Sequence, residues 1–213
     1  MIAVPAIQLV FASLLPVHAS DSNLSDADNT LILTSSALVL LMTPGLAFFY
    51  GGFTQAKNVL NTMAMSFVMM GIATLVWSIV GFSLAFSDGG ASNAFIGNPS
   101  TYAFLENLPG NWEGLRIPGL SFALFQGMFA IITPALISGA LVERISFRFW
   151  CFFTPIWILL VYTPLAHMVW GGGFLGKDLD FAGGTVVHIS SGVSALVLAG
   201  LVGSRRTWPK RIK

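Results

Sequence analysis

Five long apolar segments constrain this chain more than any other feature of its sequence. None of them contains Asp, Glu, Lys or Arg, and they are Thr30–Tyr50, Val59–Phe86, Gly119–Val142, Trp150–Trp170 and Gly184–Gly203. Each reaches the length of about 20 residues that an α-helix needs to cross a bilayer. A water-free interior requires each segment to satisfy its own backbone groups, which favours helices. Barrel strands would alternate apolar and polar residues, and these segments do not. We therefore predict an all-α polytopic membrane protein with five transmembrane helices.

Composition agrees with a membrane protein and argues against several other classes. Of the residues, 55% are hydrophobic and 9% are charged, whereas soluble domains carry about 25% charged residues. The net charge of +1 suggests neither a nucleic acid nor an acidic partner. The lone Cys151 cannot form an intrachain disulfide, and we expect its thiol to be packed and inert. A phosphate-binding G-x-x-x-x-G-K-[ST] loop, zinc-type spacing and a Ser/His/acid set are all absent from the sequence, so we expect no enzyme, cofactor or metal site.

The two ends of the sequence differ from the apolar middle. Residues 1–20 have an apolar core that ends in "VHAS" and are predicted to be a signal peptide. No Lys or Arg precedes that core, so an uncleaved interfacial or spanning segment stays open as the alternative. Residues 21–203 form the predicted five-span membrane domain, and residues 204–213 form a basic tail.

Basic residues predict the orientation in the membrane. Only Arg116 and Lys177 fall on one side of the predicted spans, and the other eight of the ten Lys and Arg residues fall on the opposite side. The positive-inside rule places the N-terminus outside and the tail in the cytoplasm, in a cell (inner or plasma) membrane. The outside loop Ser87–Pro118 is rich in Gly, Asn and Pro and carries Tyr102 and Trp112, so we expect a folded cap over the outer face.

Two histidines lie within the predicted spans, where an ionisable group is a functional hypothesis by default. His188 follows Asp180 by eight residues, which is about 12 Å along a helix. Burial favours a neutral imidazole there, suited to a proton relay or a hydrogen-bonding pore lining. A helix-to-helix tether is the alternative. His167 lies about one turn from the outer end of its span, where water can reach it, and a tether is the favoured role.

Two further polar residues accompany these histidines. Asp180 begins the fifth apolar segment and is predicted to cap that helix; attraction of a cation to the outer mouth is the alternative. Gln126 is a polar group inside the third segment, and we expect its amide to tether helices.

Aromatic residues gather toward the same outer side. Phe122, Phe125 and Phe129 share one helical face, and Trp170 ends the fourth segment. Aromatic faces can bind a cation that loses its water, with Trp the strongest. On spacing alone, packing of the phenylalanines and interfacial anchoring of the tryptophan are the favoured interpretations, and a cation site is the alternative.

Several sequence blocks resemble one family, the ammonium transporters of the Amt/Mep/Rh group. The blocks are "PGLAFFYGG" with "KNVL", "FQGMFA", "GALVERISF", "AHMVWGGG" and "DFAGGTVVHI", and they occur in family order from the first segment to the fifth. The resemblance implies a fold made from an inverted repeat of five plus five helices, of which this chain holds the first half. The second gate phenylalanine, an outer serine and a second pore histidine would lie in the other half.

The resemblance also implies roles for individual residues. Trp170 and Phe125 would line an outer site that recruits ammonium, and Phe129 would be one of two stacked gate phenylalanines that line the pore below it. Asp180 would support that site structurally or electrostatically, and His188 would be the first of two pore-lining histidines. Ammonium would release its proton near the gate and ammonia would pass the imidazoles. Potassium, which has no proton to lose, would be rejected.

The family resemblance further implies a homotrimer, contact with membrane lipid and a PII-type regulator at the cytoplasmic face. Two alternatives to transport stay open. One is a non-conducting membrane subunit that binds ammonium or regulates complete transporters. The other is an inactive truncated fragment.

Overall fold

The computed structural model describes residues 24–176 and 180–205. The predicted signal peptide, Lys177 and residues 206–213 of the basic tail lie outside the described residues. Within the described residues the regular elements are all helical, which confirms the predicted all-α class. Five helical spans are long and apolar enough to cross a membrane: Asp26–Gly52, Ala56–Phe86, Gly119–Leu141, Phe147–Trp170 and Gly184–Val202. All five predicted segments are thus confirmed, and the protein is a multi-pass membrane protein.

Each span is built from one or more consecutive helical elements. The first is α2 (Asp26–Gly52), and the second combines η1 (Ala56–Asn58), α3 (Val59–Phe67), α4 (Met69–Val76), the π-helical η2 (Trp77–Gly81) and α5 (Phe82–Phe86). The third joins α6 (Gly119–Ser138) to η5 (Gly139–Leu141). The fourth consists of α7 (Phe147–Trp157), the π-helical η6 (Ile158–Tyr162) and α8 (Thr163–Trp170), and the fifth of the π-helical η8 (Gly184–Ile189) and α9 (Ser190–Val202).

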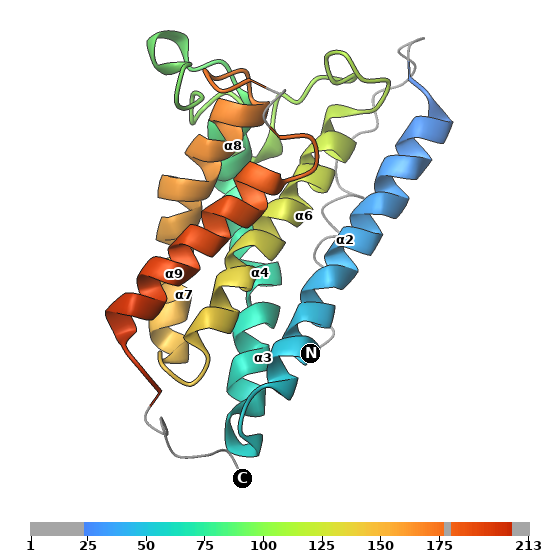
Figure 1. Ribbon diagram of the computed structural model, residues 1–213. Coiled ribbons are helices and arrows are strands. Elements are labelled where there is room, and N and C mark those ends of the chain that lie inside the picture. Colours follow the sequence, from blue (N-terminus) through green and yellow to red (C-terminus); the bar gives the residue numbers. More distant parts are fainter. Residues whose placement is uncertain (1–23, 177–179, 206–213) are drawn as a thin grey trace.

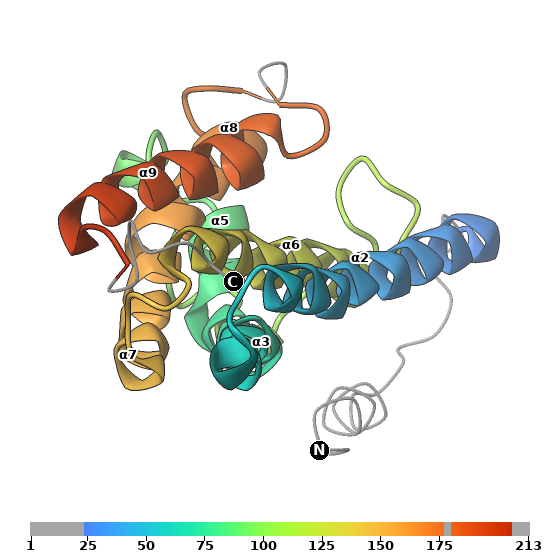
Figure 2. The same ribbon diagram turned by 60° about the horizontal axis from the view of Figure 1, so that its bottom comes forward.

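The spans run between two faces of the molecule, shown at the top and bottom of Figure 1. We call the end that carries residues 87–118 the loop face and the end that carries Gln55, Glu143 and Arg205 the tail face. The helix α6 occupies the centre, and Figure 2 shows α2 and α3 beside it. The most apolar stretch of the third span is 61% buried, compared with 17% in the first span and 22% in the fifth. The first and fifth spans therefore form the edges of the bundle.

The loop 87–118 folds against the end of the bundle through short 3-10 turns, η3 (Gly90–Ser92) and η4 (Ala103–Leu105), and an aromatic cluster. Trp112 stacks on Phe122 with ring centroids 4.3 Å apart. The same tryptophan meets Phe82 edge-on at 5.5 Å and Tyr102 at 6.0 Å. Rings of this size bury large apolar areas and add about 0.5–1.5 kcal/mol per well-oriented pair. The loop is therefore a folded cap, as expected, and Phe122 packs against it.

Candidate functional site

Three of the predicted aromatic residues form a continuous chain of ring contacts near the loop face. Phe125 and Phe129 lie one turn apart on α6, with centroids 5.1 Å apart and planes at 84°. Phe129 then meets Trp170, the last residue of α8, at 6.3 Å and 64°. These residues are half-buried. Phe122 is not part of these ring contacts, because it packs against Trp112 of the cap. Of the three phenylalanines on one face of α6, Phe122 therefore stabilises the cap, and Phe125 and Phe129 are available to the site.

Asp180 lies next to Trp170 and holds the start of the fifth span. The indole Nε1 of Trp170 donates to the Asp180 backbone carbonyl at 3.1 Å. The Asp180 side chain is buried and accepts four backbone N–H groups, at 2.5 to 2.8 Å, from Gly183, Gly184, Thr185 and Val186. Burial raises the pKa of this carboxyl, but the four donors together outweigh burial, so its pKa lies below the usual value. Asp180 is therefore an ionised cap on the helix end.

Gly183 makes the turn between Asp180 and the helix. Its φ of 88° lies in the left-handed region, where a residue with a Cβ is strained. A Cβ there would also approach Val187 Cγ2 to 3.1 Å. The Gly183 carbonyl accepts the backbone N–H of His188 at 3.0 Å, the i to i−5 contact of a π-turn. Such turns are frequent at functional sites.

His188 projects from this π-turn. Its Nδ1 lies 3.0 Å from the Gly183 carbonyl oxygen. Because a carbonyl only accepts, Nδ1 carries the proton of this contact, and in a neutral ring Nε2 is then an acceptor. The His188 residue is exposed. The tight turn therefore presents one bare ring nitrogen away from the backbone.

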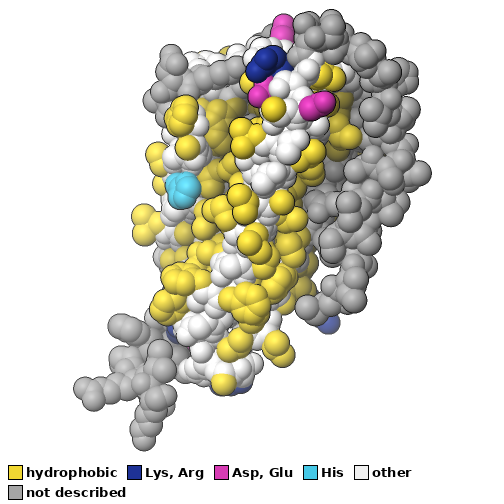
Figure 3. Space-filling view, turned by 90° about the vertical axis from the view of Figure 1, so that its right-hand side faces the viewer, with side chains coloured by type: hydrophobic (Ala, Val, Ile, Leu, Met, Phe, Trp, Pro, Cys, Tyr) yellow, Lys and Arg dark blue, Asp and Glu magenta, His cyan; other side chains and the backbone are white. Residues whose placement is uncertain are grey.

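A groove of about 390 Å³ lies beside His188, between α2, α6 and η8. Phe129 and His188 both line it, and among the described residues that line it His188 alone has a polar side chain. The remaining lining residues are Val39, Met42, Gly45, Leu46, Phe49, Ile132, Leu136, Ala182 and Val187. Figure 3 shows this side of the molecule as mainly hydrophobic, with a histidine among the apolar side chains. The aromatic chain from Phe125 to Trp170 therefore shares Phe129 with an apolar groove that contains one imidazole.

His167 lies apart from the groove, and the expectation that water reaches it is wrong. Its side chain is fully buried, with 0% exposure. Nδ1 lies 3.1 Å from the Ala85 carbonyl oxygen, and Nε2 lies 2.8 Å from the Asn93 carbonyl oxygen. A neutral ring donates to one of these oxygens and an imidazolium to both. His167 thus ties α8 to the end of α5 and to the cap, which is the tether that the sequence favoured.

We expect His167→Ala to lower the free energy of unfolding by about 3 kcal/mol, because it opens a cavity and leaves buried carbonyl groups without a donor. His167→Gln, whose amide can reach one carbonyl, should lose less. Unfolding by SDS in mixed micelles measures both. Equal stability of the alanine variant and the parent chain would contradict the tether.

The helix tether expected of Gln126 stays a prediction. Its side-chain Oε1 is buried and has no hydrogen-bond partner among the described residues. The neighbouring turn of α6 contacts η2 through Trp77, whose Nε1 donates to the Ala123 carbonyl at 3.0 Å. Within the described residues, no group of three or more His, Cys, Asp or Glu side chains is placed to hold a metal ion.

Sequence reasoning missed a polar pair at the tail face. Glu143 and Arg144 belong to the block "GALVERISF", which carried the family resemblance but received no role of its own. Both side chains form several contacts between segments that are distant in the sequence. Two adjacent residues of opposite charge between apolar segments were the signal that could have indicated this pair. The sequence does not show, however, toward which segments the two side chains point.

The described residues thus form a bundle of membrane-spanning helices in which a chain of aromatic contacts shares Phe129 with an apolar groove that contains one imidazole. The chain belongs to the Ammonium Transporter Family, whose sequence model matches residues 30–213. It is 47% identical to an ammonium transporter of Aquifex aeolicus over 192 residues, covering 89% of this chain and 45% of that protein. It thus spans less than half the length of this relative.

Solved structures agree with this assignment. The crystal structure of Saccharomyces cerevisiae Mep2 superimposes with a TM-score of 0.81 at 31% identity, over 93% of this chain and 46% of that one. A solved sensor Amt protein superimposes with a TM-score of 0.75 at 30% identity, over 84% of this chain and 44% of that one. The five-helix fold is therefore that of part of an Amt/Mep protein.

Proposed function

We propose that this chain forms the N-terminal half of an ammonium transporter or channel, with the site at the loop face receiving the ion. The observation that carries the proposal is the chain of ring contacts from Phe125 through Phe129 to Trp170, which shares Phe129 with the groove that contains His188. The relative from Aquifex aeolicus carries the name of an ammonium transporter.

The proposed path begins at Trp170 and Phe125, whose ring faces attract ammonium through cation–π contacts. The ionised carboxylate of Asp180 holds the helix end beside them and adds negative charge near the mouth. An ion is costly in an apolar groove, whereas ammonia is neutral. Release of a proton near Phe129 lets ammonia continue to His188, whose Nε2 can accept a hydrogen bond from it. Potassium has no proton to release and is rejected.

The groove is open on one side, since α2 and the fifth span form the edges of the bundle and His188 is exposed. In the proposed transporter a second half of similar construction closes the groove and supplies the second gate phenylalanine and the second histidine. The loop face lies outside the cell and the tail face in the cytoplasm, as the basic residues predict. A homotrimer surrounded by membrane lipid and a PII-type regulator at the tail face belong to the same proposal.

A second candidate function is favoured by one comparison. The fold also matches a sensor Amt protein, so a non-conducting membrane subunit that binds ammonium is the alternative. Binding of ammonium by the purified protein without flux into liposomes would support the alternative, and flux would exclude it.

Replacement of Trp170 tests the recruiting site. We expect Trp170→Leu in the full gene product to raise the KM for methylammonium uptake about tenfold, because the strongest cation–π partner is lost. Trp170→Phe also loses the hydrogen bond to Asp180 but keeps a ring, so it should show a smaller increase. Concentration-dependent uptake of labelled methylammonium measures both variants.

The control for this test is Phe95→Leu. Phe95 is an exposed aromatic residue of the cap, and its ring centroid lies 5.3 Å from that of Phe174. The KM of the Phe95→Leu variant should therefore equal that of the parent protein. A KM that is unchanged in Trp170→Leu, or equal in the leucine and phenylalanine variants, counts against recruitment by the ring.

A further inference from the structure

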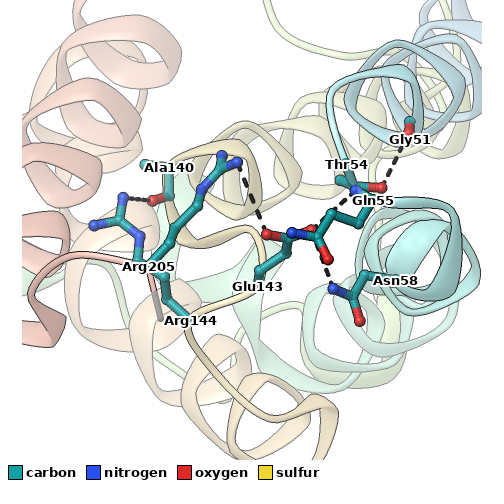
Figure 4. A network of polar contacts seen from close by, with 8 residues as sticks. All are labelled: Gly51, Thr54, Gln55, Asn58, Ala140, Glu143, Arg144 and Arg205. Atoms are coloured by element: carbon teal, nitrogen blue, oxygen red, sulfur yellow. Dashed lines mark hydrogen bonds and ion pairs between the residues drawn. The ribbon is translucent and has the colours of Figure 1, made fainter. Parts of the chain in front are cut away.

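The network in Figure 4 joins three parts of the tail face through the adjacent residues Glu143 and Arg144. The Oε1 atom of Glu143 accepts the backbone N–H of Gln55 at 2.9 Å and the side-chain Nδ2 of Asn58 at 3.0 Å. Gln55 lies in the turn that follows α2, and Asn58 ends η1 at the start of the second span. Glu143 Oε2 lies 4.0 Å from Arg205 Nη1. The carboxylate therefore fastens the end of the first span to the loop that follows η5.

Arg144 points from the same loop toward the fifth span. Its Nη1 donates to the carbonyl groups of Ala199 at 3.2 Å and Gly203 at 2.7 Å, at the end of α9. Its Nη2 donates to the Ala140 carbonyl in η5. The last carbonyl groups of a helix have no partner within the helix, and a basic side chain satisfies them and complements the helix dipole. Arg144 thus fastens α9 to the end of the third span.

The backbone at Glu143 allows the two side chains to diverge. Its φ is 63°, one of four positive φ values at residues other than glycine in the described chain. Such a conformation is unfavourable for a residue with a Cβ and persists only where the surroundings hold it. The three contacts of Glu143 lower the pKa of its carboxyl, with the Asn58 hydrogen bond the largest cause, followed by the Gln55 hydrogen bond. The side chain of Glu143 is thus held as a carboxylate.

The segments that the pair joins are those that enclose the groove. Its walls come from α2, α6 and η8, and η8 continues directly into α9. Tyr50 adds a contact at the same end, where its hydroxyl donates to the Leu136 carbonyl at 3.1 Å. A Cβ on Gly139 would come within 2.4 Å of the Tyr50 ring, so α2 and the third span touch closely there. On the α9 side, the Arg144 side chain donates hydrogen bonds to carbonyl groups at the end of the helix.

We propose that Glu143 and Arg144 form a staple that sets the separation of the groove walls at the tail face and thereby the rate of passage through the groove. The pair consists of positioning residues, because neither lines the groove. This inference rests on the proposed transport function for its effect on rate, whereas the separation of the walls is a structural property that can be measured without transport.

Two readouts test the staple. Spin labels replace Phe48, on α2, and Leu201, on α9, which are exposed residues on the two outer walls of the groove, and the distance distribution between the labels reports the separation of these walls. We expect Glu143→Ala and Arg144→Ala in the full gene product to lengthen and broaden this distribution. The maximal rate of methylammonium uptake should fall about fivefold, while KM stays unchanged because the recruiting site lies at the loop face.

Two variants separate the staple from a general loss of folding. Glu143→Gln keeps an oxygen that can accept from Gln55 and Asn58, so the distance distribution and the rate should return close to those of the parent protein. Glu113→Gln, at an exposed residue of the cap, is the matched control and should change neither readout.

Unchanged distances in both alanine variants would overturn the staple, as would a glutamine variant that behaves like Glu143→Ala. A raised KM without a lower maximal rate would also overturn it, because the effect would then lie in recruitment. If the parent protein shows no uptake, the transport proposal fails, and the distance measurement still decides whether the staple exists.

Discussion

Replacing Asp180 by alanine is expected to abolish methylammonium uptake and to lower the free energy of unfolding by about 3 kcal/mol. The carboxylate accepts four backbone N–H groups, and alanine offers none of them an acceptor. The turn at Gly183 and the π-turn that presents His188 depend on those bonds. The Trp170 indole donates to the backbone carbonyl of residue 180, which alanine keeps, so this bond changes only through displacement of the turn. Uptake assays and SDS unfolding measure the two effects.

Two variants sharpen this test. Asp180→Asn keeps one oxygen but places an NH₂ group against backbone donors, so its stability should fall between those of the alanine variant and the parent. Asp88→Ala removes an exposed aspartate whose Oδ1 accepts a single bond, from the Gly90 N–H at 2.7 Å, and should leave uptake unchanged. Normal stability and uptake in Asp180→Ala would show that the four bonds do not hold the site.

The pH dependence of stability provides an independent check. The pKa of the Asp180 carboxyl is lowered in the folded protein, relative to about 3.9 in the unfolded chain. Its contribution is therefore fully present above about pH 4 and is lost as the pH falls through the folded value. We expect this part of the acid-induced loss of stability to disappear in Asp180→Ala, while it persists in Asp88→Ala.

Replacing His188 by leucine is expected to slow uptake strongly without a cost in folding. Among the described residues that line the groove, His188 alone has a polar side chain, and its Nε2 is free to accept. Loss of one hydrogen bond raises the free energy of ammonia in the apolar groove by about 1–3 kcal/mol. A barrier raised by this amount slows passage about tenfold to a hundredfold. Because the residue is exposed, stability should change by less than about 0.5 kcal/mol.

Ile189→Leu is the matched control for this prediction, since Ile189 is the adjacent residue and is 57% exposed. It should leave uptake and stability unchanged. Uptake by His188→Leu at the parental rate would show that the imidazole takes no part in passage. Loss of uptake together with a large loss of stability would show that the π-turn needs the bond between Nδ1 and Gly183.

The sequence alone determined the five spans and the family, for a simple physical reason. The hydrocarbon interior of a bilayer accommodates only long uncharged segments whose backbone groups are hydrogen-bonded within the segment. The local composition of the sequence is therefore enough to locate the spans. Asp180 as a cap and the tether role favoured for His167 could also be anticipated, because each depends on position along one helix or near its end.

Tertiary structure alone decided where the side chains of those spans meet. Phe129 and Trp170 are 41 positions apart in the sequence and come into ring contact only because the tertiary fold places the last residue of α8 beside α6. The neighbour that each helix face contacts also decides three further features. These are the burial of His167, the absence of a hydrogen-bond partner for Gln126 Oε1 among the described residues, and the different neighbours of Phe122 and Phe125. The divergence of Glu143 and Arg144 depends on a positive φ that the surrounding contacts stabilise. Local pattern specifies a helix, but the direction and partner of a side chain are set by packing between elements that the sequence does not place next to one another.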